Sequence, residues 1–508
     1  MSKLTGNQIM TLGYPQGPII SLAINEMALH FKHKSEGELL QILQNVYTNY
    51  TSFLEDVQLA KLANACKKVH EQNVLNEKIA LYKKGIAKAL FIDEEPAEIA
   101  LNPIGISYSI FGAEHIEDGA LKQMEIAAKL PIAVAGALMP DAHQGYGLPI
   151  GGVLATNNAI IPYAVGVDIG CRMCLSIFAI EPSELKKREA YFQRELVANT
   201  LFGAGREFTN NDILSTASDI EILDRSEFKE IPFLATLHFK AKGQLGSSGS
   251  GNHFVEFGKL EITDANNPML VPLGEYVGLL THSGSRGLGA NIAAHYTKIA
   301  MQNTPLPKDA KHLAWLDLNT QAGNEYWLAM NLAGDYASAC HHTIHQKIAK
   351  AIGEKPLAMV ENHHNFAWKE MYEGKEVIVH RKGATPAGKN VLGIIPGSMT
   401  APGFIVKGKG EPTSINSASH GAGRKMSRTK AMANITYEAL QKELANYGVK
   451  LIGGGLDEAP FAYKNIDQVM QSQTELVDVL GKFYPAIVQM DGSKPRKFKY
   501  RKVRVEGE

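Results

Sequence analysis

The sequence has few cysteines and no long apolar run. Its 508 residues include four cysteines, Cys66, Cys171, Cys174 and Cys340, too few to stabilise a chain of this length through disulfides. We therefore expect a reducing compartment, the cytoplasm. No stretch reaches the roughly 18 apolar residues of a membrane-spanning helix, and the first residues lack the apolar core of a signal peptide. The sequence argues against a secreted, disulfide-rich protein and against a membrane protein.

The chain also lacks an excess of either charge. Its 52 lysines and arginines equal its 52 aspartates and glutamates, so any affinity for nucleic acid must come from local patches. One such patch is the basic run at residues 494–504, in which Phe498 and Tyr500 are interleaved. Such a run can follow a phosphate backbone while its aromatic rings stack on bases. A frayed, exposed tail is an equally good interpretation.

Residues 1–103 are predicted to form a helical extension. Ser35 followed by Glu38 is a capping-box pattern, and apolar residues then recur at helical spacing from Leu39 to Tyr47 and continue through residues 53–59. A second helix is predicted from Val74 to Leu90. No residue of this extension forms a plausible catalytic group, so we expect a structural or docking role.

From Ile104 onward, short apolar runs alternate with glycine-rich turns. This alternating pattern predicts buried sheets separated by functional loops, and thus a mixed α and β domain. Residues 139–152 are expected to form one of these loops. Residues 320–352 are amphipathic and predict a long helix that carries His341, His342 and His345.

The segment from Ser417 to Arg428 places His420 in a run of small residues, followed by two arginines four positions apart. Glycines allow backbone N–H groups to surround a phosphate. Arg424 and Arg428 would share one face if this segment were helical, and would offer forked donors to phosphate oxygens. His420 would then lie at an anion site, where an imidazole can act as nucleophile or base. The alternative is a glycine-rich turn before a basic surface helix.

A candidate metal centre begins with Asp168 and Cys171, a carboxylate and a thiol three residues apart. Cys171 and Cys174 also form a single CxxC, which is weak evidence for zinc or redox chemistry, and we interpret Cys174 as a small buried apolar residue. Three histidines in glycine- or amide-rich loops complete the set: His253, His282 and His364. Each alone is more often an ordinary core or surface residue. Together these side chains would suffice for two metal ions bridged by the sulfur, and ligand softness favours zinc.

Nine segments between about residues 116 and 467 resemble the RtcB-type RNA ligase family and occur in that family's order: MPDAHQGYGLPIGG, VDIGC, GSGNHFVE, HSGSRGLG, HHN, HRKGATPAG, IPGSM, SHGAGRKMSR and DEAPFAYKNID. Several of them are too long to recur together by chance. The resemblance implies an α+β fold, with one large catalytic domain over residues 104–508 that ends in the basic tail. Mixed β-sheets would surround a central cleft holding two metal ions.

The resemblance further implies an RNA ligase that uses GTP and two Mn²⁺ ions, in place of the zinc that softness favours. A histidine attacks GTP, the guanylyl group passes to an RNA 3′-phosphate, and the 5′-hydroxyl of a second RNA end displaces GMP. A 2′,3′-cyclic phosphate is first opened to the 3′-phosphate. The task would be RNA repair or tRNA splicing, the partner would be RNA with such ends, and some family members work with an archease-type activator.

The family's functional residues carry over to this sequence by position. His420 matches the guanylylated histidine, and the metal ligands match Asp168, Cys171 in the bridging place, His253, His282 and His364. The GTP site matches Asn252, His253, Glu256, Asn365, Pro396, Gly397, Ser398, Met399, His420, Ala422, Gly423 and Tyr463, with Lys464 nearby. The RNA and phosphate contacts match Asp141, His143, Arg286, Arg424 and Arg428. Glu256 has the chemistry to accept the N1 and N2 protons of guanine.

Three features depart from the family pattern and indicate a divergent, longer member. The extension at residues 1–103 is long, residues 337–342 replace an expected Asn-Arg pair, and no lysine is assigned to the family's terminal guanine contact. Two other functions remain open. One is a metal-dependent phosphoesterase that opens RNA 2′,3′-cyclic phosphates without ligation, and the other is a non-catalytic protein that binds RNA through the basic tail.

Overall fold

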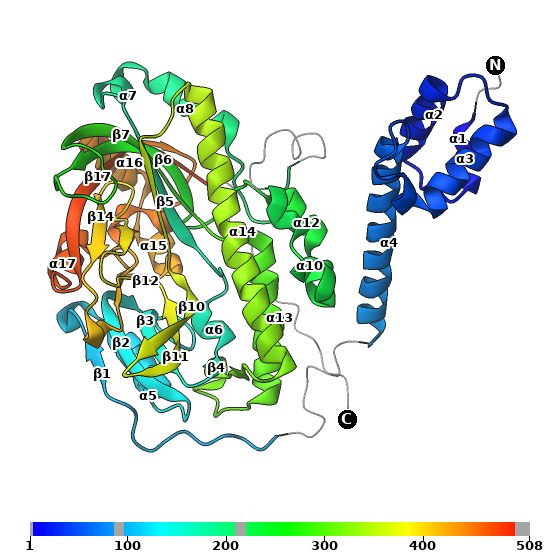
Figure 1. Cartoon of the computed structure of the whole chain (residues 1–508). Coiled ribbons are helices and arrows are strands. Elements are labelled where there is room, and N and C mark those ends of the chain that lie inside the picture. The colour runs from blue at the N-terminus through cyan, green and yellow to red at the C-terminus, as the bar shows by residue number, and fades with distance from the viewer. Residues whose placement is uncertain (1–3, 86–95, 209–219, 493–508) are drawn as a thin grey trace. The chain divides into compact units, whose positions relative to one another are not determined.

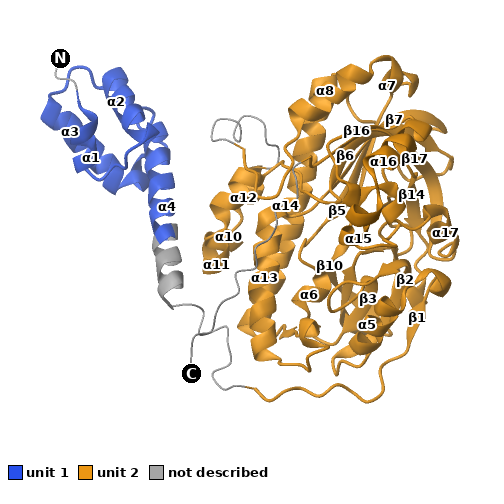
Figure 2. Ribbon diagram, turned by 180° about the vertical axis from the view of Figure 1, so that it is seen from behind, with its two compact units in different colours: residues 1–86 blue, residues 87–508 orange. Residues whose placement is uncertain are grey.

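The computed structural model describes residues 4–85, 96–208 and 220–492. The chain divides into two compact units, residues 1–86 and residues 87–508 (Figure 2). The expected boundary at residue 103 lies further along the chain, within a segment that belongs to the second unit. The Ile99 N–H donates to the carbonyl of Pro305 at 2.9 Å, and the Ile106 N–H donates to that of Ala128 at 2.9 Å. The basic run at residues 494–504 and the predicted helical residues 86–90 lie outside the described residues.

The first unit is helical, as the sequence predicts. It contains α1 (Gly6–Thr11), α2 (Pro18–His30), α3 (Glu36–Thr48), the short 3₁₀-helix η1 (Tyr50–Phe53) and α4 (Ala60–Gly85). The predicted capping box is confirmed, because the Ser35 hydroxyl accepts from the Glu38 N–H and the Glu38 carboxylate accepts from the Ser35 N–H. The apolar face of α3 is buried in a core that this unit forms by itself.

The predicted continuation of that face through residues 53–59 is confirmed for Phe53, Leu54 and Leu59, which pack in the core of this unit, but it is wrong for Val57. Val57 is 99% exposed, and the chain turns before α4. Asp56 explains the turn, because its carboxylate accepts hydrogen bonds from the N–H groups of Gln58 and Leu59 at 2.8 Å each. A short polar side chain that binds nearby backbone competes with helical hydrogen bonding, so spacing alone does not reveal this break.

The second unit is built on two larger sheets. The five-stranded sheet has the order β1 (Tyr108–Ile110), β2 (Ala133–His143), β3 (Ile150–Thr156), β11 (Lys375–Lys382) and β10 (Asn365–Tyr372). The expected loop at residues 139–152 is therefore partly wrong, since β2 continues to His143 and β3 begins at Ile150. Residues 135–143 are all buried, and burial outweighs the local preference of this sequence for loops. The pairing of β2 with β3 shifts between Leu138 and His143, around Pro140.

The eight-stranded sheet supplies the opposite side of the cleft. Its order is β13 (Leu392–Ile395), β14 (Gly403–Gly408), β17 (Val477–Met490), β6 (Phe254–Ile262), β7 (Gly274–Ser283), β5 (Arg172–Phe178) and β9 (Ala358–His363), with β16 (Lys450–Ile452) paired to β17. Most pairs are antiparallel, whereas β1–β2 and β16–β17 are parallel. The predicted α+β class with mixed sheets is confirmed.

The long helix α14 (Gln321–Ile352) confirms the prediction for residues 320–352. It begins after Thr320, whose hydroxyl accepts from the Gly323 N–H, and ends at Gly353 with φ 75°. The helix packs against α13 (Arg286–Asn303) and against β5 and β7 (Figure 1). Its packing on these strands covers the side of the sheet that faces away from the cleft.

Smaller elements complete the second unit. Two short sheets pair β4 (Ala159–Ile160) with β8 (Leu316–Asp317) and β12 (Ala384–Pro386) with β15 (Ser417–Ser419). The remaining helices are α5 (Asp118–Ala128), α6 (Pro162–Val165), α7 (Ser183–Lys187), α8 (Glu189–Asn199), α10 (Glu227–Glu230), α11 (Pro232–Ala235), α12 (His238–Gln244), α15 (Arg428–Asn434), α16 (Tyr437–Tyr447) and α17 (Ile466–Gln471). The 3₁₀-helices are η3 (Ala113–His115), η4 (Ile220–Asp224), η5 (Lys311–Leu313), η6 (Pro412–Ser414), η7 (Leu456–Glu458) and η8 (Pro460–Ala462). Over residues 4–85, 96–208 and 220–492, every helix falls short of the length and apolarity that a bilayer span requires.

Candidate active site and metal centre

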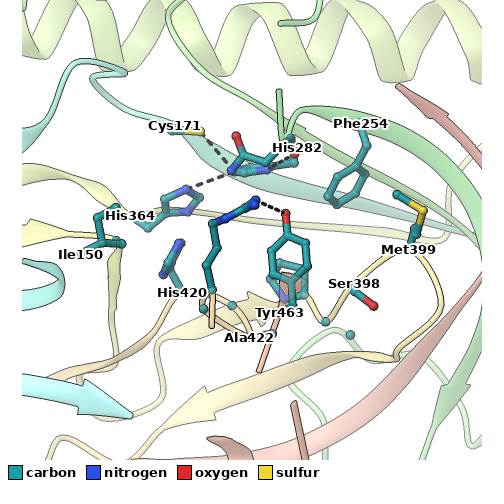
Figure 3. Close-up of a pocket in the computed structure, with 18 of the residues that line it drawn as sticks. Ile150, Cys171, Phe254, His282, His364, Ser398, Met399, His420, Ala422 and Tyr463 are labelled. Carbon is teal, nitrogen blue, oxygen red and sulfur yellow. Dashed lines mark hydrogen bonds between the residues drawn. The ribbon is translucent and has the colours of Figure 1, made fainter. Parts of the chain in front are cut away.

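A cavity of about 360 Å³ lies between the two larger sheets (Figure 3). Most of the residues predicted to be functional line it: His143, Asp168, Cys171, Asn252, Glu256, His282, His364, Asn365, Pro396, Gly397, Ser398, Met399, His420, Ala422, Gly423, Arg424, Arg428 and Tyr463. Asp141, His253 and Arg286 are not among the lining residues. The fold thus brings together segments that are up to several hundred residues apart in the sequence.

The loop between α6 and β5 carries Asp168 and Cys171. Gly170 occupies its centre with φ +66°, and a Cβ there would lie 2.8 Å from the Cα of Gly334 in α14. Only glycine allows this close approach in this backbone conformation. The Gly170 N–H also donates to the carbonyl of Asn365 at 2.7 Å. The loop is therefore anchored on both sides, and it holds the carboxylate and the thiol at the cavity.

Five of the predicted metal ligands form two groups that share Cys171. In one group, His253 Nε2 lies 2.8 Å from Asp168 Oδ2 and 3.5 Å from Cys171 Sγ. In the other, His282 Nε2 lies 3.2 Å from Cys171 Sγ and 3.2 Å from His364 Nε2 (Figure 3). The ligand atoms of each group lie within 4.8 Å of one another. This arrangement suits two cations bridged by one sulfur.

The protonation state of His282 follows from its other ring nitrogen. Nδ1 lies 2.9 Å from the carbonyl oxygen of Asn252, which can only accept, so Nδ1 carries the proton. Nε2 therefore presents a lone pair toward Cys171 and His364. Burial lowers the pKa of His282 to about 3, with the nearby His253 adding to the effect. A neutral imidazole whose lone pair faces a thiol and another imidazole is the form that binds a cation.

The acidic partners of this centre have shifted pKa values as well. Burial, reinforced by Asp168, raises the pKa of the Cys171 thiol well above its usual value. Burial would also raise the pKa of Asp168, but His253 outweighs it and the pKa lies below the usual value. A bound cation would favour the Cys171 thiolate, because metal coordination deprotonates thiols. The donor set thus fits a metal centre.

His420 follows β15, and the centroid of its ring lies 5.0 Å from that of the ligand His364. His420 Nδ1 lies 2.6 Å from Oδ2 of Asp141 in β2, and its backbone N–H donates to the same oxygen at 3.1 Å. Asp141 is 0% exposed. Burial opposes ionisation of this carboxyl, but the His420 imidazole outweighs burial and holds the pKa of Asp141 below its usual value. The carboxylate thus fixes the Nδ1–H tautomer and leaves the lone pair on Nε2.

This position of Asp141 differs from the prediction that it faces RNA. A fully buried carboxylate behind His420 cannot offer itself to a phosphate, and its charge would repel one. His143, two residues further along, does line the cavity. Burial lowers its pKa to about 4, so His143 is neutral at pH 7. Asp141 therefore orients His420, and His143 contributes an uncharged ring to the cavity wall.

Another part of the cavity wall combines a buried carboxyl group with apolar and aromatic side chains. Glu256 in β6 is 4% exposed and lines it, and burial raises the pKa of this carboxyl well above its usual value. Phe254, Met399 and Tyr463 add apolar and aromatic surface (Figure 3). Gly423 has φ +71°, and a Cβ there would lie 2.1 Å from the carbonyl oxygen of Asp141. Only glycine fits at this position, beside Ala422.

Arg424 and Arg428 do not share a helix face, because α15 begins only at Arg428. Arg424 instead forms a β-bridge with Tyr463, and its Nη1 donates to Glu458 Oε2 at 3.0 Å. Arg428 pairs with Glu458 and with Asp457. Glu458 is 2% exposed and joins both arginines, a role that the sequence did not suggest. Arg428 is 44% exposed along its side chain, compared with 15% for Arg424.

Lys382 was not predicted as a site residue, although it lies within the HRKGATPAG segment. It is 7% exposed and lines the cavity at the end of β11. Its Nζ donates to the carbonyl of Tyr146. Burial lowers the pKa of Lys382 to about 7. The following residue, Gly383, approaches the ring of His420, since a Cβ there would lie 3.1 Å from Cε1. Nothing in the local sequence distinguishes this lysine from an exposed one.

Three other predicted residues are held by backbone groups. The Asn365 amide donates to the carbonyl of Asp168 at 3.2 Å and accepts from the Gly383 N–H at 2.8 Å. Lys464 donates to the carbonyl of Ala142 at 2.6 Å. Arg286 has a positive φ of 57° and donates to the carbonyl of Gly203 at 3.0 Å. Asn365 therefore links the loop of Asp168 to Gly383, and Lys464 links the segment after η8 to β2.

Cys174 is 0% exposed, as expected for a small buried residue. It pairs with Thr281 across β5 and β7, whereas Cys171 precedes β5 and lines the cavity. Both thiols are free. The two cysteines of the CxxC therefore have different surroundings, and only Cys171 belongs to the two ligand groups described above.

Comparison with known proteins agrees with this site. Residues 123–491 match the family model described as tRNA-splicing ligase RtcB. The chain is 34% identical over 391 residues to the RNA-splicing ligase RtcB of Escherichia coli K12, and this alignment covers 72% of this chain and 92% of that protein. It is 30% identical over 467 residues to the tRNA-splicing ligase RtcB of Nanoarchaeum equitans, and this alignment covers 78% of this chain and 97% of that protein. It is 31% identical over 424 residues to the tRNA-splicing ligase RtcB of Thermococcus kodakarensis, and this alignment covers 70% of this chain and 87% of that protein. With its matching segments gathered around one cavity, this chain belongs to the RtcB family.

Proposed function

We propose that this protein is a GTP-dependent RNA ligase that joins 3′-phosphate or 2′,3′-cyclic phosphate ends to 5′-hydroxyl ends. One observation carries the proposal. His420, whose lone pair Asp141 fixes on Nε2, lines the same cavity as Asp168, Cys171, His282 and His364, four of the five side chains that form the two candidate metal groups. A nucleophile beside such groups suits nucleotidyl transfer. The names of the relatives, RNA- and tRNA-splicing ligases, support the same activity.

The first step forms a covalent histidine guanylate. Nε2 of His420 attacks the α-phosphorus of GTP, an N–P bond forms, and the P–O bond to pyrophosphate breaks. Asp141 stabilises the positive charge that develops on the imidazole, as a buried carboxylate does for a catalytic histidine. Glu256 accepts the N1 and N2 protons of guanine. The loop from Pro396 to Met399 and the backbone at Ala422, Gly423 surround the nucleotide, with Asn252, Asn365 and Tyr463 beside it.

Two transfers to RNA follow. An oxygen of the RNA 3′-phosphate attacks the guanylate phosphorus, the N–P bond to His420 breaks, and an RNA-guanylate forms. The 5′-hydroxyl oxygen of the second end then attacks the RNA phosphorus and GMP leaves. Lys382, with a pKa of about 7, is placed to accept the hydroxyl proton. Arg286, Arg424, Arg428 and His143 are the proposed contacts to the RNA ends. A 2′,3′-cyclic end is opened by water beforehand.

Asp168, Cys171, His253, His282 and His364 would hold two Mn²⁺ ions, with Cys171 between them. The ions would neutralise phosphate charge and orient the reacting oxygens. Oxygen atoms of GTP and RNA would add to this donor set, which would favour manganese over the zinc that sulfur and nitrogen ligands alone suggest. Burial keeps the pKa of the Cys171 thiol high and the pKa values of the His282 and His364 imidazoles low, so these three groups are neutral without a cation, and only the thiol must lose a proton to become a ligand.

The physiological setting is also proposed. The free thiols suit the cytoplasm, and tRNA splicing or RNA repair supplies RNA ends of this kind. The helical unit, residues 1–86, precedes the segment that matches the family, and we assign it a docking role toward RNA or an archease-type activator. The domain division proposed here is therefore a helical extension followed by one catalytic domain.

Labelled GTP tests the proposal. The full-length protein is incubated with [α-³²P]GTP and Mn²⁺, denatured and separated by electrophoresis. Label is expected in the wild type and in His238→Ala, a matched histidine variant in α12 outside the cavity lining, and is lost in His420→Ala. Label that survives His420→Ala overturns the assignment. Opening of a cyclic phosphate without any guanylate label would instead establish the phosphoesterase.

A further inference from the structure

A buried chain of hydroxyl and imidazole groups lies behind the metal centre, between β7 and α14. Successive side chains of a strand point to opposite faces, so Thr281 and Ser283 share one face of β7 while His282 points to the cavity. Thr281 and Ser283 are both 0% exposed. His341 and His345, one helical turn apart on α14, contact this face. Each end of the chain meets a β-strand of the same sheet.

Five hydrogen-bonding groups follow one another in this chain. His345 Nδ1 lies 2.7 Å from the Ser176 hydroxyl, and His345 Nε2 lies 2.8 Å from the Thr281 hydroxyl. The same hydroxyl lies 2.5 Å from His341 Nδ1. His341 Nε2 lies 3.1 Å from the carbonyl oxygen of Ser283. This series of hydrogen bonds thus begins at Ser176 on β5, includes two histidines of α14 and ends at Ser283, the residue after His282.

Only one arrangement of protons satisfies all of these contacts when both rings are neutral. The Ser283 carbonyl can only accept, so His341 carries its proton on Nε2 and its Nδ1 accepts from the Thr281 hydroxyl. The Thr281 oxygen then accepts from His345 Nε2–H, and His345 Nδ1 accepts from the Ser176 hydroxyl. Burial lowers the pKa of His345 to about 3 and that of His341 well below its usual value, which keeps both rings neutral.

A third metal ion is the alternative reading of this cluster. Ligand atoms of Cys174, His341 and His345 lie within 4.8 Å of one another. The Thr281 hydroxyl, however, lies between the two imidazoles, 2.5 Å from one ring nitrogen and 2.8 Å from the other. An ion bound by both rings would have to take its place. The remaining nitrogen of each ring already has a partner, so the contacts favour a hydrogen-bonded chain.

We propose that Thr281, His341 and His345 are positioning residues that hold His282 in place for one of the two metal ions. The inference rests on the proposed metal centre. The hydrogen bonds attach the residues on both sides of His282, Thr281 and Ser283, to α14. They therefore restrict movement of the His282 imidazole along the strand or about its axis. His282 belongs to the group with Cys171 and His364 and not to the group with Asp168 and His253. Loss of these hydrogen bonds should therefore weaken the binding of one ion selectively. Residues 337–342, noted above as a departure from the family pattern, supply His341.

Thr281→Val tests this proposal, because it removes the central hydroxyl at nearly constant volume. Mn²⁺ binding to the full-length protein is titrated by electron paramagnetic resonance of the free ion. The wild type is expected to bind two ions. In Thr281→Val, the affinity for one ion should fall about 10- to 100-fold, as is typical for loss of a group that orients a ligand, while the other ion keeps its affinity. Thr281→Ser should restore the wild-type titration.

Two further variants guard against a merely structural effect. Thr297→Val is the matched control, because the buried Thr297 hydroxyl on α13 has no hydrogen-bond partner within the described parts of the chain. Both ions should bind as in the wild type. Ser176→Ala removes only the far end of the chain, and it should weaken the same ion to a smaller extent. This variant keeps the test available if Thr281→Val does not fold.

The outcomes separate this inference from the proposed function. A wild type that binds two ions, with unchanged affinities in Thr281→Val, overturns the positioning role alone. A wild type that binds no Mn²⁺ overturns the metal centre and the inference together. A third ion that is lost in Cys174→Ala would show that the cluster is a metal site, and would overturn the hydrogen-bonded chain.

Discussion

The buried carboxylate of Asp141 accepts two hydrogen bonds from His420, one from ring Nδ1 at 2.6 Å and one from the backbone N–H at 3.1 Å. Asp141 lies in β2 and His420 follows β15, so the contact joins the five-stranded sheet to the two-stranded sheet of β12 and β15. One oxygen fixes both the position and the tautomer of the imidazole. The nucleophilic role proposed for Nε2 therefore depends on a residue that does not line the cavity.

Asp141→Asn should slow guanylylation by on the order of 10²- to 10⁴-fold, by analogy with the loss of the orienting carboxylate in a catalytic triad. The amide cannot stabilise a positive imidazole, and it can present its NH₂ group to Nδ1 and so favour the wrong tautomer. The measurement is the initial rate of covalent labelling at saturating GTP. GTP affinity should change little, and a variant that loses affinity while keeping its rate would contradict the orienting role.

Glu256→Ala should remove the preference for guanine. A hydrogen bond to a charged acceptor contributes about 1.5–3 kcal/mol, so the wild type should bind GTP about 10- to 100-fold more tightly than inosine triphosphate, which lacks the 2-amino group. In the variant the two nucleotides should bind alike. Equilibrium binding of both nucleotides provides the measurement, and a preference that persists in Glu256→Ala would place the base elsewhere.

The same residue predicts a pH dependence. Burial raises the pKa of Glu256 and so favours the protonated carboxyl in the empty pocket, and this carboxyl must lose its proton to accept from guanine. GTP affinity should therefore rise with pH below that pKa, by at most about tenfold per unit. Glu256→Gln cannot ionise and should lack this rise. Binding measured from pH 6 to 8 in both proteins, with the difference taken, isolates the contribution of Glu256.

Cys171→Ala and Cys174→Ala should differ sharply although the two thiols are three residues apart. Cys171 belongs to both ligand groups, so its loss should weaken both metal ions, whereas Cys174→Ala should retain both. Bound metal is counted by mass spectrometry after equilibrium with Mn²⁺. Loss of only one ion in Cys171→Ala would show that the sulfur does not bridge.

Lys382 should react as an amine with a pKa near 7. Burial disfavours its charged form, so trace acetylation followed by peptide mass analysis should give a half-maximal rate near pH 7. An exposed lysine should reach this point only near its ordinary pKa of about 10.4. Because Lys382 lines the cavity, GTP should suppress its labelling. A midpoint near pH 10 would remove Lys382 from consideration as the acceptor of the 5′-hydroxyl proton.

Local patterns in the sequence were sufficient to predict several elements and residue types. The capping box at Ser35 and Glu38 and the helix at residues 321–352 depend on contacts within a few residues, and both formed as predicted. Asp168 and Cys171 are close in sequence, so one glycine turn suffices to present both. The composition of the segments around His253, His282, His364 and His420 likewise marked these histidines as unusual before any packing was known, although His282 proved to lie in β7 and not in a loop.

Contacts between distant segments decided the features of the fold and of the site that local patterns did not predict. Residues 139–143 became a strand because burial on the five-stranded sheet outweighed a local sequence typical of a loop. Arg424 lies outside α15, and Glu458 joins it to Arg428, which no spacing rule anticipates. The pKa of Lys382 depends on its burial and not on its neighbours in the chain.

The sequence by itself determined which chemical groups are present and which short segments turn, cap or coil, because these properties depend on nearby residues. Only the tertiary structure decided that Asp141 orients His420 across 279 residues, and that Thr281 lies between two imidazoles behind His282. Such pairings depend on sheet register and helix packing. A shift of one residue in a strand would turn each of these side chains to the opposite face.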